Sequence, residues 1–215
     1  MPPGAARQLP GGGLLRAVPN PAPAARIAPA TDEELIDAVE RGDGSSAGAL
    51  YDRLLPSVDR ALYRVFGRRE IDHDDLVQAS FEQIVTTLSR RKYARACSLA
   101  TWASTIAAHV GLNALRARRR ARSVFQPEAE GEAEDVGPAS TDGERVASAR
   151  CELERVRGAL SAMPAAKAET LLLHDVMGHE LAEIAVIMGV SVAAAQSRLV
   201  RARRELVDRL GEEQP

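Results

Sequence analysis

The stretch from 181 to 206 constrains the fold of this chain more than any other part of its sequence. Apolar residues at helical spacing fill 181–188, and Gly189 follows directly, where the left-handed backbone of a helix C-cap costs glycine nothing. A second helix is predicted after it, with an apolar stripe of Val192, Ala195, Leu199, Ala202 and Leu206. Two short helices joined by a glycine turn predict either a plain helical hairpin with a solvated basic face or a helix-turn-helix, whose second helix enters the major groove of DNA.

The opposite face of the second predicted helix favours the DNA-binding interpretation. It carries hydroxyl, amide and guanidinium groups, which are the side-chain types that contact base edges and phosphates. The predicted DNA-contacting residues are Gln196, Ser197, Arg198, Val200, Arg201 and Arg204. For Arg198 a phosphate contact and an intramolecular ion pair are equally compatible with the pattern.

Charge is segregated along the chain although the net charge is only −2. Residues 83–127 hold nine basic residues and no acid, whereas 128–144 hold seven acids and no base. Such asymmetry is typical of a nucleic-acid surface next to an acidic, solvated segment. On composition alone, a merely solvated basic face explains the same run equally well.

Helical periodicity runs through the rest of the chain and predicts an all-α protein, because no strand-like alternation of useful length occurs. A Thr31–Glu34 capping box begins a first helix, and a second stops near Gly67. A third helix starts among the acids at 72–75, and a fourth covers 99–120. The core residues predicted for the third and fourth helices are Val77, Phe81, Ile84, Val85, Leu88, Trp102, Ile106, Val110 and Leu115.

Composition divides the chain into four parts. Residues 1–30 are rich in Pro, Gly and Ala without periodicity, which predicts a disordered N-terminal tail. Residues 31–123 predict a four-helix domain, 124–147 a flexible acidic linker, and 148–210 a small helical domain with the helix-turn-helix. The linker is either a solubilising spacer or an acidic segment that folds back on the basic run and suppresses stray DNA binding.

Several functional classes find no support in the sequence. Two cysteines and four scattered histidines give neither a disulfide framework nor a metal-ligand set. No phosphate loop, nucleophile motif or recognisable carboxylate pair indicates a catalytic residue or a cofactor. No apolar run reaches membrane-span length, and the N-terminus lacks the apolar core of a signal peptide. A cytoplasmic, non-enzymatic protein without cofactor or metal is therefore expected.

Three motifs occur in an order that resembles a known family. They are DDLVQASFEQIV at 74–85, TWASTIAAHVGLNALRARRR at 101–120 and EIAVIMGVSVAAAQSRLVRARREL at 183–206. Over 31–210 the chain resembles bacterial RNA polymerase sigma factors of the extracytoplasmic-function group, in the sigma-70 family. The resemblance implies a four-helix region 2 and a helix-turn-helix region 4 joined by a flexible linker. It implies binding to core RNA polymerase, promoter recognition, DNA melting and transcription initiation.

The resemblance also assigns expected roles to individual residues. The helix with the Asp-Leu-Val-Gln motif docks on the polymerase, which implies contacts through Asp75, Gln78 and Glu82. Melted −10 DNA is expected on Arg91, Lys92, Tyr93, Trp102, His109, Asn113, Arg116, Arg119 and Arg120. Arg118 and Arg122 are expected to contact phosphates as well. A positive groove with aromatic stacking suits single strands, so Tyr93 is a candidate stacking platform. For Trp102, a core position and a stacking platform are equally compatible with the sequence.

Duplex −35 DNA is the expected ligand of the recognition helix. His109 and Asn113 stand where the family usually has Asn and Asp, and Ala193-Ala194-Ala195 replaces a usual Gly-Thr-Val, so the promoter sequence is left open. The family implies an anti-sigma factor as a candidate partner, although no residue identifies one. The alternative is a helix-turn-helix regulator that acts without polymerase, which leaves 74–88 and the aromatic and basic loop at 89–98 unexplained.

Overall fold

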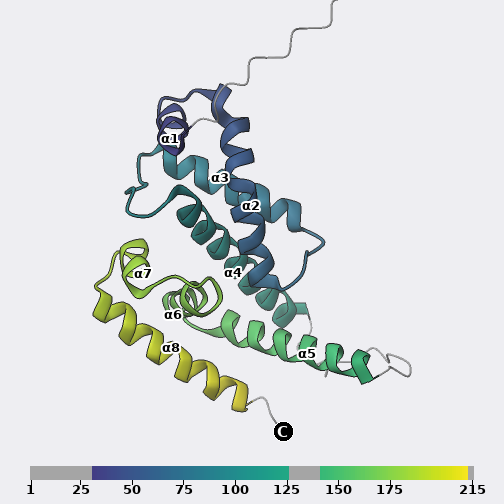
Figure 1. The fold of residues 1–215 in the computed structure, drawn as a ribbon. Helices are drawn as coiled ribbons and strands as arrows, with labels where there is room; N and C mark the ends of the chain where they lie inside the picture. Colours follow the sequence, from purple (N-terminus) through teal and green to yellow (C-terminus); the bar gives the residue numbers. More distant parts are fainter. Residues whose placement is uncertain (1–30, 126–140, 213–215) are drawn as a thin grey trace, which may run out of the picture. The chain divides into compact units, whose positions relative to one another are not determined.

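A computed structural model describes residues 31–125 and 141–212 of the chain. The predicted tail, most of the predicted linker and the fold-back hypothesis for its acids lie outside the described residues. Within them every regular element is a helix (Figure 1), which confirms the all-α prediction.

The first part of the described chain holds four α-helices. They are α1 (Asp32–Glu40), α2 (Ala47–Phe66), α3 (His73–Ser89) and α4 (Leu99–Phe125), with a short 3-10 turn, Gly44–Ser46, before α2. Helix α2 packs along α4, and α3 contacts both (Figure 1). Burial of apolar side chains between these helices stabilises the domain. Fully buried members of this core include Leu54, Val58, Leu62, Ile84, Leu88, Leu99 and Leu112.

The predicted helix ends are confirmed by their caps. The Thr31 hydroxyl accepts a hydrogen bond from the Glu34 backbone N–H at 3.3 Å, and the Glu34 carboxylate accepts one from the Thr31 backbone N–H at 2.8 Å. This reciprocal capping box satisfies two backbone donors that would otherwise lack partners. Gly67 ends α2 in the left-handed conformation with φ 64°, where a Cβ would be strained.

Several residues predicted for the core lie elsewhere. Val85 is 39% exposed, and Trp102, Val110 and Leu115 are only half-buried. The reason is that α4 turns its small residues toward α2: a Cβ added to Gly111 would lie 3.1 Å from Cγ1 of Val65. Close approach of the two helices therefore uses alanine and glycine, and the larger side chains of α4 flank that contact.

The second part of the described chain consists of α5 (Thr141–Ala162), α6 (Ala165–Leu171), a π-helical turn (Leu172–Val176), α7 (Leu181–Met188) and α8 (Val192–Glu212). Helix α5 begins at Thr141, inside the range predicted as linker. The helix-turn-helix prediction is confirmed, with Gly189 at φ 63° between α7 and α8. Its small core comprises Leu173, Ile184, Ala185 and Ala195. Val192, predicted in the apolar stripe, is 48% exposed because it lies in the first turn of α8.

Ion pairs fasten α8 to the preceding helices. Arg203 Nε lies 3.0 Å from Asp175 Oδ2 in the π-helical turn, and Lys167 Nζ lies 2.6 Å from Glu205 Oε2. The hydrogen bond from Arg203 lowers the pKa of Asp175, and that from Lys167 lowers the pKa of Glu205. These contacts set the orientation of the second helix of the motif.

In the described ranges no single helix is long and apolar enough to cross a membrane. Taken together, α7 and α8 are long and apolar enough to span a membrane, but the two helices are bent by 103° at their junction.

Candidate functional site

One side of α3 presents the three residues predicted to dock on a protein partner. Asp75, Gln78 and Glu82 are all exposed, and Gln78 Nε2 donates to Glu82 Oε1 at 3.0 Å. Acids in the first turn of α3 are favoured by the positive end of the helix dipole. The face is therefore polar and acidic, and the side chains on it are accessible.

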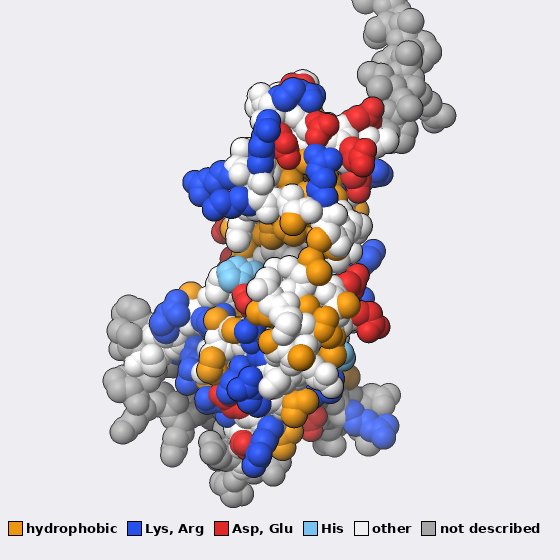
Figure 2. Space-filling view, turned by 90° about the vertical axis from the view of Figure 1, so that its left-hand side faces the viewer, with side chains coloured by type: hydrophobic (Ala, Val, Ile, Leu, Met, Phe, Trp, Pro, Cys, Tyr) orange, Lys and Arg blue, Asp and Glu red, His pale blue; other side chains and the backbone are white. Residues whose placement is uncertain are grey.

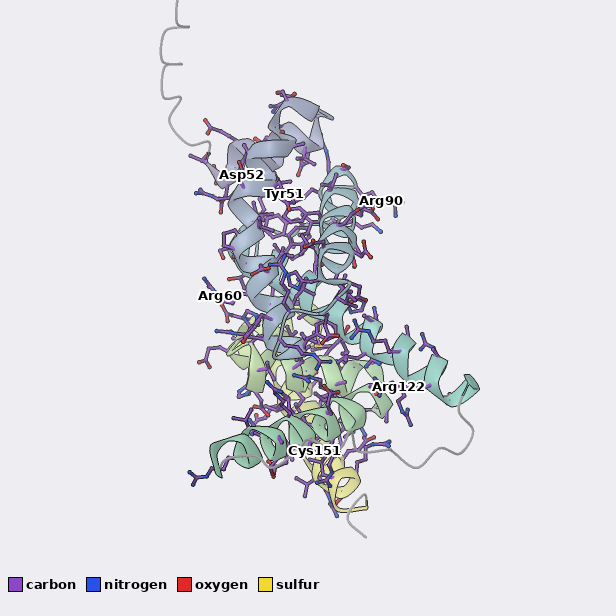
Figure 3. The ribbon with its side chains drawn as sticks, turned by 90° about the vertical axis from the view of Figure 1, so that its right-hand side faces the viewer. Tyr51, Asp52, Arg60, Arg90, Arg122 and Cys151 are labelled. Carbon is purple, nitrogen blue, oxygen red and sulfur yellow. The ribbon has the colours of Figure 1, made fainter. Side chains whose placement is uncertain are left out.

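A groove of about 800 Å³ lies beside this face, between α2 and α3. The Tyr51 ring contacts Phe81 with 4.5 Å between centroids, and Figure 3 shows Tyr51 on α2 facing α3. Tyr51 and Val85 are 41% and 39% exposed, so the groove has an apolar floor beneath its carboxylates. Sequence reasoning missed Tyr51, since nothing in its own helix marks it. Lining the groove are Tyr51, Asp74, Val77, Gln78, Phe81, Glu82, Val85 and Thr86.

The loop between α3 and α4 joins an aromatic pair to several basic residues. The rings of Tyr93 and Trp102 lie 4.7 Å apart between centroids and are tilted by 37°. The Tyr93 hydroxyl donates to the backbone carbonyl of Cys97, and burial raises the pKa of Tyr93, so it remains a neutral donor. Both rings are half-buried. Trp102 is thus neither a fully buried core residue nor an isolated exposed one.

Carboxylates of α1 hold this loop, a feature that sequence reasoning missed. Arg95 lies 2.7 Å from Asp37 Oδ1, and Arg91 lies 3.5 Å from Glu40 Oε2. Arg91 and Arg95 both adopt the left-handed conformation with φ 53°. The pairs leave both guanidinium groups accessible, and Lys92 is exposed at the loop surface.

The face of α4 that follows the aromatic pair carries the remaining residues predicted for −10 DNA. Arg116 Nη1 donates to Asn113 Oδ1 at 3.3 Å, and Arg119 and Arg120 are exposed. His109 Nδ1 hydrogen-bonds to the Glu169 carboxylate of α6. The predicted −10 residues of this paragraph therefore lie along α4. The contact of His109 with Glu169 shows that the second half of the chain covers part of this face.

Arg118 does not fit the phosphate-contacting role predicted for it. Its guanidinium binds Glu70 at 2.9 Å and Asp72 at 2.6 Å, and it stacks 4.9 Å above the centre of the Phe66 ring. Because two carboxylates and an aromatic ring already bind this guanidinium, Arg118 fastens the loop between α2 and α3 to α4.

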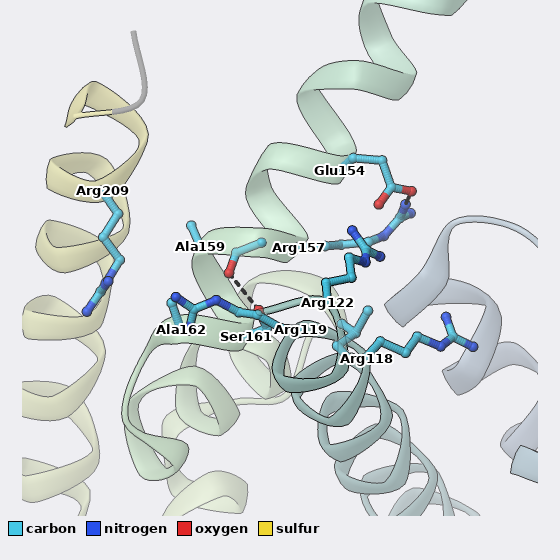
Figure 4. Close-up of a pocket in the computed structure, with 11 residues that line it drawn as sticks. Arg118, Arg119, Arg122, Glu154, Arg157, Ala159, Ser161, Ala162 and Arg209 are labelled. Atoms are coloured by element: carbon cyan, nitrogen blue, oxygen red, sulfur yellow. Dashed lines mark hydrogen bonds and ion pairs between the residues drawn. The ribbon is translucent and has the colours of Figure 1, made fainter. Parts of the chain in front are cut away.

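An arginine-rich pocket of about 240 Å³ lies between α4, α5 and α8 (Figure 4). Arg119 and Arg122 reach it from α4, and Arg209 reaches it from α8. Arg157 of α5 is only 6% exposed, donates to Glu154 at 2.8 Å and donates through Nε to the Val65 carbonyl at 3.2 Å. A buried guanidinium is costly without partners. Glu154 is a partner on α5 itself, and the bond to the Val65 carbonyl holds α5 against the end of α2.

The outer face of α8 presents most of the residues predicted for −35 DNA. Gln196, Ser197, Arg201 and Arg204 are exposed, and Val200 is 61% exposed. Figure 2 shows basic side chains interspersed with hydrophobic ones over the lower half of the molecule, where α7 and α8 lie. The recognition face is accessible and chemically mixed.

Arg198 lies apart from this face. It is half-buried, and its Nη1 lies 3.9 Å from the Met188 sulfur. The described residues give it no carboxylate partner, so the ion-pair alternative is not supported there.

Comparisons with known proteins match both halves of the chain. The family model "Sigma-70 region 2" matches residues 50–121, and "Sigma-70, region 4" matches residues 153–206. RNA polymerase sigma factor NccH of Alcaligenes xylosoxydans xylosoxydans is 31% identical over 186 residues, which are 83% of this chain and 94% of that protein. RNA polymerase sigma factor CnrH of Cupriavidus metallidurans is 31% identical over 146 residues, 66% of this chain and 75% of that protein.

Two solved structures are also similar. One is CnrH in complex with the cytosolic domain of CnrY, with 23% identity, a TM-score of 0.48 and coverage of 85% of this chain and 99% of that one. The other is the sigma factor RpoE in complex with the anti-sigma factor NepR from Bartonella quintana, with 20% identity, a TM-score of 0.43 and coverage of 76% and 96%.

A four-helix region 2 followed by a helix-turn-helix region 4 defines a promoter-directing subunit of RNA polymerase. The chain belongs to the sigma-70 family of RNA polymerase sigma factors, in its extracytoplasmic-function group. As such it binds core RNA polymerase and directs transcription initiation at promoters. The family and function predicted from the three motifs are thereby confirmed.

Proposed function

We propose that three faces of this chain each bind a different partner during transcription initiation. The α3 face and its groove dock on core polymerase, the α3–α4 loop with the outer face of α4 holds the melted −10 strand, and α8 reads the −35 duplex. The observation that carries the proposal is the Tyr93–Trp102 pair at the foot of a basic loop. It lies in the same domain as the α3 groove, and a duplex-binding regulator needs neither feature.

Melted DNA suits the loop for a physical reason. Unpaired bases expose their π-faces, and stacking on an aromatic side chain contributes about 1–3 kcal/mol per base. Lys92 and the accessible guanidinium of Arg91 supply positive charge beside the rings, while Arg116, Arg119 and Arg120 continue it along α4. Stacking then traps the bases, and the basic groups position the backbone.

Base readout is assigned to α8. Gln196 and Arg201 carry the groups that bind adenine and guanine edges in the major groove, and exposed Val200 suits the methyl group of thymine. Arg204 lies further along the same helix and is assigned to phosphate. Half-buried Arg198 supports the packing of α7 on α8 rather than readout.

The chain performs no covalent chemistry in this proposal, because the polymerase forms the phosphodiester bonds. Its place of action is the cytoplasm, where polymerase meets promoters, and an anti-sigma factor is the further partner that family membership implies. We assign 31–123 to region 2, 124–147 to the linker and 148–210 to region 4, with α5 reaching back to Thr141.

Run-off transcription separates this function from a regulator that acts without polymerase. Purified core polymerase is incubated with fragments of the source genome, with and without the chain. Specific transcripts that require the chain support the proposal. Duplex binding by the chain alone, with no transcripts when core is added, would favour the regulator.

A further inference from the structure

The arginine-rich pocket between α4, α5 and α8 gathers more positive charge than the proposed function uses. Five arginines line it, against the single carboxylate of Glu154. We infer that this pocket binds a small anion with two linked phosphate groups, either inorganic pyrophosphate or the diphosphate of a nucleotide. The inference goes beyond the proposed function, because the ligand is neither DNA nor polymerase.

Much of the charge in the pocket has no counter-charge among the described residues. Arg118 is held by two carboxylates of the α2–α3 loop, and Arg209 lies 2.9 Å from Glu205 on its own helix. Arg119 and Arg122 have no hydrogen-bond or ion-pair partner for their side chains in the described part of the chain. Like charges that share a hollow repel one another, so an anion among them is favoured.

Arg157 adds a buried donor that lacks a partner. The residue is 6% exposed, and its Nε and Nη1 atoms donate to the Val65 carbonyl and to Glu154. Its Nη2 is buried and has no hydrogen-bond partner among the described residues. Buried polar groups are rarely left in this state, because the loss of water is costly. Figure 4 shows the guanidinium of Arg122 next to that of Arg157, where an anionic oxygen would accept from both.

Guanidinium groups approach the pocket at two ends, which favours an anion with two charged centres. Figure 4 shows Arg119 extending from α4 toward Arg209 of α8, whereas Arg122 extends toward Arg157 of α5. The planar fork of a guanidinium matches a phosphate group with two parallel hydrogen bonds. Two linked phosphates can therefore bind at both ends at once, and a single phosphate can bind at only one.

The acid in the pocket does not oppose this charge. The Glu154 carboxylate lies 2.8 Å from Arg157 Nη1 and 3.9 Å from Arg68 Nη2, so cations already surround it. Its side chain is 49% exposed, which places it where water also solvates the charge. Since the remaining basic groups come from α4, α5 and α8, a bound anion would connect three helices and stabilise the folded chain by mass action.

The lining favours a small anion over a nucleobase or a DNA backbone. None of the described residues that line the pocket is aromatic, so no ring there can stack on a base. DNA phosphates meet side chains on an open surface, whereas Arg157 is almost fully buried. Pyrophosphate is also released at each nucleotide addition by RNA polymerase, so this anion is present wherever a sigma factor acts.

Isothermal titration calorimetry of the full chain without polymerase tests the inference, with inorganic pyrophosphate in magnesium-free buffer as the probe. Arg122→Gln and Arg209→Gln remove one guanidinium from each end of the pocket. Each should weaken pyrophosphate binding roughly ten- to a hundredfold, the loss expected for a charge-assisted hydrogen bond. Arg90→Gln is the matched control, since Arg90 is exposed at the end of α3 and lies outside the pocket lining. It should bind as the native chain does.

Orthophosphate, adenosine diphosphate and guanosine diphosphate define the ligand class in the same assay. Orthophosphate should bind at least about tenfold more weakly than pyrophosphate. Nucleoside diphosphates that match pyrophosphate would show that the diphosphate alone is recognised, and weaker binding by them would assign the inorganic ion. The inference is wrong if the native chain does not bind pyrophosphate, if orthophosphate binds equally well, or if Arg90→Gln loses as much affinity as the pocket variants.

A second measurement separates the pocket from the DNA-binding faces. Pyrophosphate should raise the thermal unfolding midpoint of the native chain and leave that of Arg209→Gln nearly unchanged. Arg209→Gln should bind a pool of single-stranded oligonucleotides within about twofold of the native affinity, because Arg209 lies outside the residues assigned to DNA. Equal losses of oligonucleotide and pyrophosphate affinity would assign the pocket to DNA and overturn the inference. Failure of the proposed −10 or −35 contacts would leave pyrophosphate binding intact.

Discussion

Trp102 in the first turn of α4 stacks against Tyr93 in the preceding loop, with 4.7 Å between the ring centroids. The contact joins the most basic loop of region 2 to the helix that continues the positive charge. The Tyr93 hydroxyl is bound to the Cys97 carbonyl, so the loop is closed on itself around the ring. Aromatic surface and positive charge are thus held together before any DNA is present.

Replacing Trp102 by alanine should reduce the amount of open promoter complex by about five- to a hundredfold, because one stacked base is lost. Permanganate reactivity of unpaired thymines near −10 measures this with the reconstituted holoenzyme. Trp102→Phe keeps a ring at the site and should retain most of the reactivity. Equal reactivity of the native and alanine proteins would remove Trp102 from the DNA site.

Arg201→Ala should change the sequence preference at −35 as well as the affinity, since a good base contact is worth about 1–3 kcal/mol. Selection from a randomised −35 library by holoenzyme provides the measurement. Arg204→Ala serves as the comparison, because a phosphate contact weakens all sequences alike. If Arg201→Ala also weakens every sequence equally, Arg201 contacts the backbone.

The ion pair between Asp175 and Arg203 predicts an acid-sensitive contribution to the stability of region 4. The hydrogen bond from Arg203 lowers the pKa of Asp175 in the folded chain. A lowered pKa gives stability that is present above the unfolded pKa, about 3.9, and is lost as the pH falls through the folded value. Asp175→Asn should therefore lower the thermal midpoint at pH 7.

The deficit of Asp175→Asn should begin to shrink below about pH 4, where the carboxylate of the unfolded chain becomes protonated, and should vanish once the pH also falls below the lowered pKa of the folded chain. Thermal unfolding followed by circular dichroism across this range provides the measurement. Asp208→Asn, an exposed change on α8, the helix that carries Arg203, is the control and should leave the midpoint unchanged. A constant deficit at every pH would mean that the charge of Asp175 contributes nothing.

Helix ends were predictable from the sequence because local chemistry decides them. A capping box needs only Thr31 and Glu34, and a left-handed helix end needs only a glycine, as at Gly67 and Gly189. The structure has these caps where the pattern predicts them. Outward-facing residues of a regular helix were also predictable. The exposed side of α8 follows from its apolar stripe, because helical periodicity fixes the opposite face.

Residues whose positions depend on packing between helices were not predictable. Val85 has helical spacing with Phe81 and Leu88, but it lies at the edge of the α2–α3 groove and stays exposed. Tyr51 joins that groove only because α2 packs beside α3. The contact of His109 with Glu169 likewise depends on how two halves of the chain meet, which no local pattern encodes.

The acidic face of α3 is the proposed contact with core polymerase, and charge reversal at Asp75 and Glu82 tests this contact. Both side chains are exposed, so Asp75→Arg with Glu82→Arg should leave the fold intact by circular dichroism. The matched control is a double reversal on exposed acids of region 4, Glu152→Arg with Asp208→Arg. It makes the same change in net charge away from α3.

The most direct measurement is the affinity of the labelled full chain for purified core RNA polymerase. We expect the Asp75→Arg, Glu82→Arg protein to bind at least about tenfold more weakly than the native chain, since like charges at a contact are repulsive. The region 4 control should bind within about twofold of native. Native affinity in the α3 variant would show that the polymerase contacts another surface of the chain.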